Sequence, residues 1–329
     1  MLKITDNASL RRLNTFGINA TCDTLIEYTS AEDLVDVKIC GSFLNIGLGS
    51  NMLFVKPHYR GTVLHSKIAD FEMLDDRTVR VGAGIEWDDT VARTVKMKLY
   101  GLENLSLIPG QTGSAAVQNI GAYGAEAGDR IVSVETYDIK NHKKVVFSHD
   151  NMHYGYRDSI LKHRDMENFV VTHVVFRLDK EFEPILTYGG LASHFPDRHA
   201  LTADELRNTI IEVRRSKLPD PVVLGNAGSF FKNPVVSAEK AAALGAVYPA
   251  MPQFDVAGGV KLSAGWLIQE AGWKGKSLGH AGVYEKQALV LVNLGGATGS
   301  DIETLAKAVT DDVNEKFGIE LQPEVRFIY

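Results

Sequence analysis

Two glycine-rich segments of the sequence contain residue types that could hold a phosphate-bearing ligand. The first, residues 45–51, reads Asn-Ile-Gly-Leu-Gly-Ser-Asn and follows an apolar run typical of a strand. Glycines permit positive φ angles and let backbone N–H groups approach a ligand closely, which is how loops bind phosphate. The segment lacks both the Gly-Lys-Ser/Thr of a Walker loop and the third glycine of a dinucleotide fingerprint. By itself it leaves two interpretations open, a ligand-binding loop and a tight turn without a ligand.

The second segment, residues 108–124, contains four glycines, several hydroxyl and amide side chains, and no charged residue. A surface loop rarely avoids charge over such a length, whereas a segment around a buried ligand does so when backbone amides bind that ligand. The segment therefore predicts a neutral wrap around a large planar cofactor that carries a pyrophosphate.

Taken together, the two segments resemble a known family. The pattern N-x-G-x-G-S-N, followed by I-P-G-x-x-G-S/T-x-x-x-x-N-x-G-A-Y-G, is similar to the flavin-binding domain of the UDP-N-acetylenolpyruvoylglucosamine reductases, which belong to the vanillyl-alcohol-oxidase-like flavoproteins. Residues 155–159, 225–234 and 323–327 also resemble motifs of that family. Residues 186–190 resemble the tyrosine-bearing loop of its longer type.

The resemblance implies that the chain binds FAD and uses NADPH as the hydride-donating co-substrate. No histidine lies within the glycine-rich segments to attach a flavin, so we expect the FAD to be non-covalent. The implied FAD contacts are Asn45, Gly47, Gly49, Ser50, Asn51, Gly110, Thr112, Gly113, Asn119 and Gly121.

The reaction implied by the resemblance has two halves. NADPH gives a hydride to FAD, and the hydride then passes to the enolpyruvyl ether of UDP-N-acetylglucosamine, which becomes UDP-N-acetylmuramate, a peptidoglycan precursor. Hydride addition places negative charge on the enolpyruvyl carboxylate, and the adjacent carbon must then take up a proton. The site therefore needs a cation for the carboxylate and a proton donor.

The resemblance assigns these needs to three residues. Arg157 would bind the carboxylate with two parallel hydrogen bonds, Glu324 would polarise the enol as a protonated acid, and Ser229 would donate the proton. Each residue type also fits a structural role: a surface ion pair for Arg157, a solvated strand end for Glu324 and a turn serine for Ser229.

The resemblance also implies five substrate-binding residues. Lys217 and Asn233 would contact the diphosphate or the uridine, with Tyr188 packed over it and Gln287 nearby. Arg326 would position Glu324 or the phosphate. Lys217 fits equally well as a solvated lysine at a helix end, where its charge is favourable for the helix dipole.

Composition argues against several other classes of protein. The 329 residues include 35 Lys+Arg and 41 Asp+Glu, a formal net charge of −6, whereas nucleic-acid binders need a basic surface. Cys22 and Cys40 are the only cysteines, no apolar run could cross a bilayer, and no signal peptide is recognisable. The histidines, among them the pairs 149/153 and 194/199, lack convergent carboxylates for a metal. We expect a cytoplasmic monomer that binds neither metal, membrane nor nucleic acid.

The elements that must position these residues alternate irregularly, so the predicted fold class is α+β. Helices are expected to start near Ser30 and to cover 86–99, 204–217, 262–271 and 301–317, the last with a capping box of Ser300 and Glu303 and with Gly318 just past its end. Strands are expected at 25–28, 43–46, 53–55, 62–64, 78–81, 131–139, 144–147, 170–178, 288–292 and 325–329.

The resemblance implies two α+β subdomains around the FAD and a C-terminal α+β substrate domain. We expect them at residues 1–66 together with the tail strand 321–329, at 67–213, and at 214–320. Two alternatives remain: another FAD-dependent sugar or hydroxy-acid oxidoreductase on the same scaffold, and a non-catalytic module that binds a sugar nucleotide or a flavin.

Overall fold

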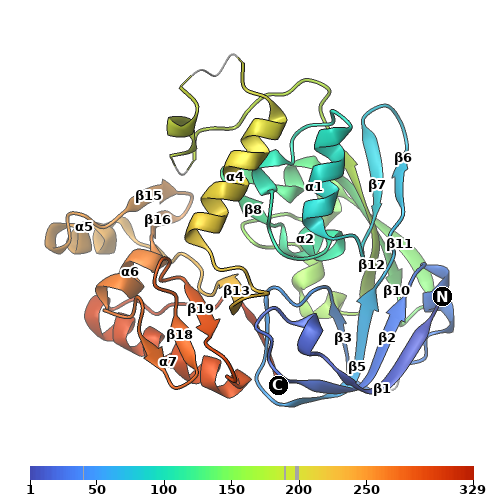
Figure 1. Ribbon diagram of the computed structural model, residues 1–329, viewed down its shortest axis with the longest axis horizontal. Helices are drawn as coiled ribbons and strands as arrows, with labels where there is room; N and C mark the ends of the chain where they lie inside the picture. Colours follow the sequence, from blue (N-terminus) through green and yellow to red (C-terminus); the bar gives the residue numbers. More distant parts are fainter. Residues whose placement is uncertain (40, 189, 197–199) are drawn as a thin grey trace. The chain divides into compact units, whose positions relative to one another are not determined.

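The computed structural model describes residues 1–39, 41–188, 190–196 and 200–329, which contain both helices and sheets (Figure 1). The contacts divide the chain into two compact units. Unit 1 consists of Met1–Ala8, Cys22–Leu48 and Arg60–Ser216, and unit 2 of Ser9–Thr21, Gly49–Tyr59 and Lys217–Tyr329. Each unit is described by itself.

Unit 1 is built on two larger sheets. The four-stranded sheet has the order β1 (Lys3–Ser9), β2 (Thr21–Tyr28), β5 (His58–Ser66), β3 (Phe43–Ile46), with β3 parallel to β5. The five-stranded sheet is antiparallel and has the order β11 (Lys143–Ser148), β10 (Ile131–Asp138), β12 (Phe169–Arg177), β7 (Thr78–Gly82), β6 (Phe71–Met73).

Two apolar cores cover the two faces of the five-stranded sheet. On one face Tyr137 and Val170 pack against Ile26 and Leu64 of the four-stranded sheet. On the other face the sheet packs against α1 (Trp87–Lys96) and α2 (Thr112–Gln118), both of which lie beside β7 and β12 in Figure 1. Because the central strand β12 is buried on both faces, it is an almost continuous apolar run.

Shorter elements complete unit 1. They are α3 (His149–Met152), α4 (Ala203–Lys217), the hairpin of β8 (Gly121–Ala122) and β9 (Ala125–Glu126), and the 3₁₀ turns Glu32–Asp36, Glu103–Leu105, Ala127–Arg130, Ile160–Lys162, Arg164–Met166 and Leu191–His194.

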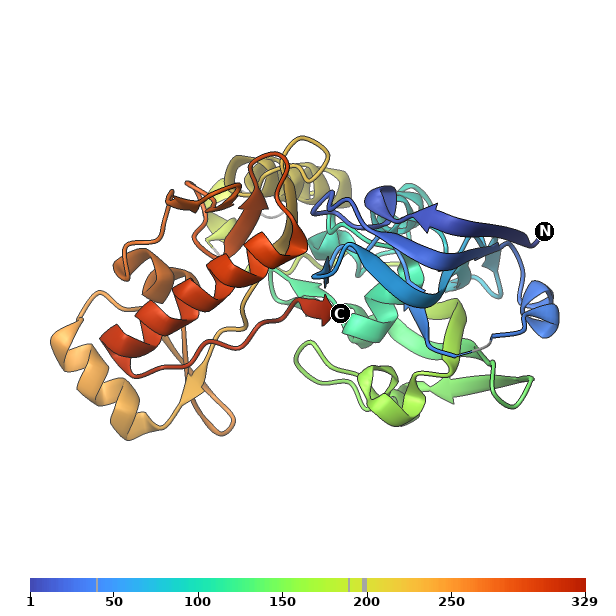
Figure 2. The ribbon, with the colours of Figure 1, turned by 90° about the horizontal axis from the view of Figure 1, so that it is seen from below.

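Unit 2 contains three sheets and three helices. The largest sheet has the order β13 (Gly225–Ser229), β19 (Val290–Asn293), β18 (Ala281–Val283), β17 (Ser277–Leu278), and the long helix α7 (Gly299–Phe317) packs on it (Figure 2). A second sheet joins β14 (Val235–Val236), β16 (Gly259–Leu262) and β15 (Gln253–Val256). The remaining elements are α5 (Ala238–Val247), α6 (Ala264–Glu270) and the 3₁₀ turn Arg11–Leu13.

The third sheet of unit 2 ties distant segments together, because β20 (Arg326–Ile328) pairs in parallel with β4 (Met52–Phe54). The approach of α7 to this pair requires a glycine, since a Cβ on Gly299 would lie 1.8 Å from the carbonyl oxygen of Phe54. The same is true of Gly225, whose Cβ would lie 2.2 Å from the carbonyl oxygen of Phe16. These contacts explain why residues 9–21 and 49–59 belong with the C-terminal part of the chain.

The secondary structure differs from the sequence prediction in four places. The helix expected near Ser30 is a single 3₁₀ turn, and the expected neutral wrap contains α2. Leu262 ends a strand, so α6 begins two residues later than predicted. α7 is capped by Thr298 and Asp301 rather than by Ser300 and Glu303. Thr298 and Asp301 have the same capping-box spacing and lie two residues earlier, where Gly299 allows the helix to begin against Phe54.

The predicted three-part division remains a prediction. Its boundary at 213/214 lies close to the change from unit 1 to unit 2 at Ser216/Lys217, whereas no unit boundary falls at 66/67. The expected tail strand is present as β20, paired with β4.

Candidate active site

Three glycine-containing segments of unit 1 meet at the start of α2, where Gln111 joins them. The buried Gln111 amide donates to the carbonyl oxygens of Ser66 (3.2 Å) and Gly84 (2.9 Å). A Cβ on Gly47 would lie 3.1 Å from Ser114 Oγ and 3.2 Å from Gln111 Oε1. Gly47 is thus close to α2, and the sequence analysis assigned no role to Gln111 although it lies within the recognised motif.

The first backbone amides of α2 are already bonded within the protein. The N–H of Thr112 donates to Ile85 O (2.8 Å), that of Gly113 to Ala83 O (3.0 Å), and that of Gln111 to Ser114 Oγ (3.1 Å). The expectation that this neutral segment offers its backbone amides to a pyrophosphate is therefore wrong for these three residues. The reason is that α2 docks on the end of β7, where a Cβ on Gly113 would lie 2.7 Å from Ala83 Cβ.

Two of the expected FAD contacts have side chains that are fully buried and used by the protein. The Thr112 hydroxyl lies 2.8 Å from Thr90 Oγ1 and 3.1 Å from Ile85 O. The Asn119 amide donates to Glu126 Oε2 (2.8 Å) and Gly155 O (2.9 Å), and its oxygen accepts from Gly128 N (2.8 Å). These side chains shape the loops around a ligand and are not themselves available to it.

Beside Gly47, two buried polar atoms have no hydrogen-bond partner. They are Asn45 Oδ1 on β3 and Nε2 of His65, which is opposite Ile46 on β5. Burial lowers the pKa of His65, so its ring is held neutral. Buried polar atoms without partners are rare in proteins, and both fit a site that a polar ligand completes. The residues present on this side of unit 1 are therefore compatible with FAD.

Arg157 is positioned by a strained turn. The backbones of Gly155 and Asp158 bond to each other across the turn at 3.1 Å in both directions, and Arg157 adopts the left-handed φ of +55°. For a non-glycine residue this conformation costs about 1–2 kcal/mol. The guanidinium donates to the carbonyl oxygens of Asn119 (3.4 Å) and Gly121 and lies 4.0 Å from Glu126 Oε1. A structural role on an exposed surface would not require such strain.

In unit 2 the structure brings Ser229 and Glu324 together. Ser229 is the exposed last residue of β13, followed by the buried Phe230, whose carbonyl oxygen accepts the Glu324 N–H at 2.8 Å. The expected FAD contact Asn51 joins the same place, because its side chain donates to Glu324 O (3.2 Å) and its carbonyl oxygen accepts from Arg326 N (3.0 Å).

Two expected substrate-binding residues meet at the start of α6. Asn233 Oδ1 accepts from Ala264 N (3.0 Å), and Gln287 Oε1 would lie 3.0 Å from a Cβ on Gly265. Lys217 is the exposed last residue of α4. Gly49 adopts a φ of +60° close to Leu13, and Ser50 is partly buried.

The expected tyrosine-bearing loop belongs to unit 1, and its residue Gly189 lies outside the described residues. Tyr188 is 54% exposed, and its Cβ would lie 3.6 Å from a Cβ on Gly124. The Asn104 amide fixes the position of the loop by donating to Ile185 O (2.9 Å) and Tyr123 O (2.8 Å).

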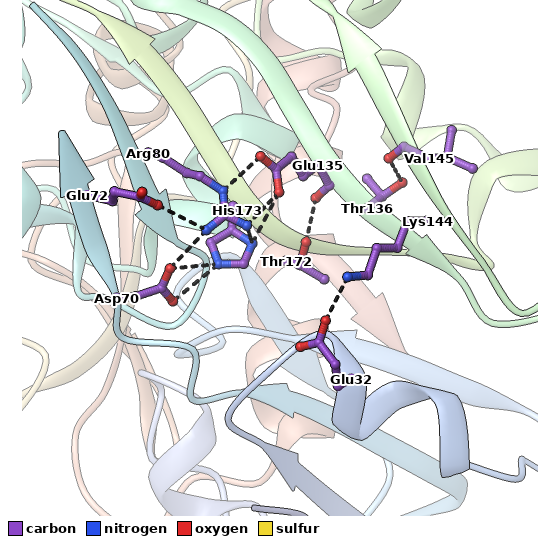
Figure 3. A network of polar contacts seen from close by, with 10 residues as sticks. All are labelled: Glu32, Asp70, Glu72, Arg80, Glu135, Thr136, Lys144, Val145, Thr172 and His173. Atoms are coloured by element: carbon purple, nitrogen blue, oxygen red, sulfur yellow. Dashed lines mark hydrogen bonds and ion pairs between the residues drawn. The ribbon is translucent and has the colours of Figure 1, made fainter. Parts of the chain in front are cut away.

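A separate polar cluster lies between the two sheets of unit 1 (Figure 3). We call it the Arg80 network: Arg80 donates to Glu135 (2.8 and 2.7 Å), to Asp70 (3.1 Å) and to His173 Nδ1 (2.9 Å), and His173 Nε2 lies 3.0 Å from Asp70. It lines a cavity of about 310 Å³. Burial and the Arg80 charge lower the pKa of His173, which fits a neutral ring that donates to Asp70 and accepts from Arg80.

Among the described residues there is no group of three or more His, Cys, Asp and Glu side chains that could hold a metal ion. His199 and Cys40, which the sequence analysis considered, lie outside these residues. No helix in the described part of the chain is long and apolar enough to cross a membrane.

The fold and the Gly47 region define a flavoprotein, and comparison with known proteins agrees. Residues 25–142 match the family model of the FAD binding domain, and residues 220–328 match that of the UDP-N-acetylenolpyruvoylglucosamine reductase C-terminal domain.

Whole-length relatives give the particular family. UDP-N-acetylenolpyruvoylglucosamine reductases of Bacteroides fragilis, Porphyromonas gingivalis and Escherichia coli (strain K12) are 48%, 44% and 42% identical to this chain, covering 97%, 99% and 98% of it and 98%, 100% and 96% of themselves. The crystal structure of the reductase (MurB) from Thermus caldophilus shares the fold, with a TM-score of 0.71 at 23% identity, covering 100% of this chain and 99% of that one.

The chain belongs to the UDP-N-acetylenolpyruvoylglucosamine reductase family. The resemblance predicted from the sequence is thereby confirmed, as are the α+β FAD-binding fold and the enzymatic, FAD-dependent nature of the protein.

Proposed function

We propose that this enzyme reduces the enolpyruvyl ether of UDP-N-acetylglucosamine to UDP-N-acetylmuramate, using NADPH as the hydride donor, in the synthesis of peptidoglycan precursors. The observation that carries the proposal is the bond between Phe230 O and Glu324 N, which places Ser229 beside Glu324 in a chain of this family. FAD bound without a covalent link would take the hydride from NADPH and supply it to the substrate carbon.

Arg157 would hold the carboxylate of the substrate. Its guanidinium is preorganised, because two backbone carbonyl oxygens and a strained turn fix its orientation before substrate binds. A preorganised cation stabilises the charge that develops on the carboxylate without reorganising during the reaction.

Glu324 and Ser229 would handle the proton. Glu324, in its acid form, would donate a hydrogen bond to the substrate carboxylate, which favours the enol over the separated charges. Ser229 would donate its hydroxyl proton to the carbon next to the carboxylate. The buried Phe230 and Phe231, with ring centroids 5.1 Å apart, hold the Ser229 backbone rigidly for this step.

The remaining residues would bind and orient the two nucleotides. Lys217, Asn233, Tyr188 and Gln287 would hold the sugar nucleotide, and Arg326 would support Glu324. Asn45, Gly47, Gly49, Ser50, Asn51, Gly110, Gly113 and Gly121 would surround FAD, with Thr112 and Asn119 supporting the loops from behind. We further propose that the enzyme acts as a cytoplasmic monomer, which sedimentation at several concentrations tests.

The variant Ser229→Ala tests the proposal. NADPH should bleach the flavin absorbance at the wild-type rate, whereas the return of absorbance on addition of the enolpyruvyl substrate should slow by about 10²–10⁴-fold, because a positioned proton donor is lost. Ser277→Ala, which removes an exposed hydroxyl from another strand of the same sheet, is the matched control.

Three outcomes would count against this proposal. Fast reoxidation in Ser229→Ala would exclude Ser229 as the proton donor. Rapid reoxidation of the wild type by O₂ alone would favour an oxidase on the same scaffold. A flavin that NADPH never bleaches would favour a non-catalytic binding module.

A further inference from the structure

The buried side of α4 ends in an arginine. Leu206 and Ile210 are fully buried and pack with Leu186 and Leu191, and Arg214 follows at the next position of the same i, i+4 row. Core positions of a helix are normally apolar, and arginine is almost never placed there unless it is paired.

Arg214 has no such pair. Its Nε is shielded from solvent and has no hydrogen-bond partner, and no ion pair of Arg214 exists among the residues that the structure describes. The nearby carboxylate, Asp88, is already occupied: both of its oxygens accept from Arg207, at 2.7 and 2.8 Å, and one also accepts the Leu107 N–H at 2.5 Å.

The charge of Arg214 is therefore left without a counter-charge. Burial lowers the pKa of its guanidinium, an effect that the electrostatic interactions with Tyr123 and Asp88 only partly oppose. Because a desolvated cation without a partner is unfavourable, a residue of this kind indicates an anion that the isolated chain does not contain.

The surroundings of Arg214 suit such an anion. The Tyr123 hydroxyl interacts electrostatically with both Arg214 and Tyr188, so two phenols accompany the guanidinium. Tyr188 is largely exposed, which leaves this side open to a ligand. Lys217, three residues further along α4, lies on the same helix face and adds a second cation. We call Arg214, Tyr123 and Tyr188 the Arg214 cluster.

We propose that the Arg214 cluster binds a phosphoryl group of a nucleotide, in the first place the diphosphate of the sugar-nucleotide substrate. A guanidinium binds phosphate oxygens with two parallel hydrogen bonds, and phenol hydroxyls donate to the same oxygens. A diphosphate carries two charges, which matches the two cations one helical turn apart. The assignment of the diphosphate to the sugar nucleotide rests on the function proposed above; NADPH is the other possible source of the phosphoryl group.

The test compares Arg214→Gln with Arg215→Gln, which removes an exposed arginine from the same turn of α4. We expect Arg214→Gln to raise the KM for the sugar nucleotide about 10- to 100-fold, the size of one charge-assisted interaction. Calorimetry with UDP as the probe should show a similar loss of affinity. Arg215→Gln should match the wild type, and Arg214→Lys should recover affinity only in part, because it restores the charge without the planar fork.

FAD content and the rate of bleaching by NADPH serve as checks that each variant is folded. If Arg214→Gln raises the KM for NADPH instead, the phosphoryl group belongs to NADPH. If neither KM nor the affinity for UDP changes in Arg214→Gln or Arg214→Lys, the inference is overturned. If wild-type enzyme fails to turn over the enolpyruvyl substrate but binds UDP through Arg214, the proposed function is wrong while the phosphoryl site stands.

Discussion

Unit 1 contains two arginines that face opposite situations. Arg80 lies in a network in which guanidinium, carboxylates and imidazole satisfy one another, with every printed contact between 2.7 and 3.9 Å. Arg214 lies at the end of an apolar helix row, and its Nε has no partner. Both side chains are partly buried, but only the first has its charge balanced by the protein.

The difference separates residues that stabilise a fold from residues that bind a ligand. A balanced network contributes to the folded state and leaves no donor for another molecule. An unbalanced guanidinium contributes little to stability and retains its donors for an anion. The Arg80 network therefore looks inward, although it lines a cavity, and the Arg214 cluster looks outward.

The largest effect on stability should come from Arg80→Met. The variant leaves Glu135 and Asp70 partly buried without their cation, so the free energy of unfolding should fall by about 2–4 kcal/mol. Urea unfolding measures the change. Arg177→Met, an exposed arginine on the same sheet, should stay within about 0.5 kcal/mol of the wild type. Equal losses in the two variants would show that the Arg80 network is not special.

The next effect should appear with Arg214→Met in the presence of ligand. Without ligand its stability should lie within about 1 kcal/mol of the wild type, because no hydrogen bond is lost. At a UDP concentration of 100 times the wild-type Kd, the wild type gains about 2.7 kcal/mol, and a variant that binds about 10-fold more weakly gains about 1.4 kcal/mol. Thermal shifts with and without UDP measure this. A large loss without ligand would mean that Arg214 has a structural role.

A smaller effect should depend on pH through His173. Its pKa is lowered in the folded protein, so below about pH 6.5 the unfolded chain binds a proton that the folded chain does not. Stability from this group is complete above pH 6.5 and falls as the pH drops toward the folded pKa. His173→Gln should flatten the dependence of the urea midpoint between about pH 7.5 and 5.5. His65, shifted in the same direction, is present in both proteins and cancels. An unchanged slope would contradict the neutral-ring assignment.

The smallest effect should come from Lys144→Met. Lys144 Nζ lies 2.6 Å from Glu32 Oε1 at the rim of the same cavity, but the two side chains are 63% and 71% exposed. Exposed ion pairs contribute almost nothing, so neither the urea midpoint nor its salt dependence should change measurably. A clear loss would show that the network extends to the rim.

Much of the fold could be predicted locally. The stripe Ile302, Leu305, Val309 and Val313 is buried as expected, and Gly318 ends α7 in the left-handed conformation. The starting residue of α7 could not be predicted, because two capping boxes of the same spacing compete and the contact of Gly299 with Phe54 decides between them. The interior helix α2 was missed because its sequence contains glycine and β-branched residues that favour a loop on local grounds.

By itself, the sequence determined the family, the FAD-binding nature of the chain and which residues are candidates, because motif letters and their order survive without coordinates. Only the tertiary structure decided which polar groups are already used. Thr112, Asn119 and the first amides of α2 are occupied by neighbours far away in sequence, whereas Arg214, in a helix row that reads as core, is not. Hydrogen bonding and charge balance depend on what folding brings within about 3 Å, and no local pattern contains that information.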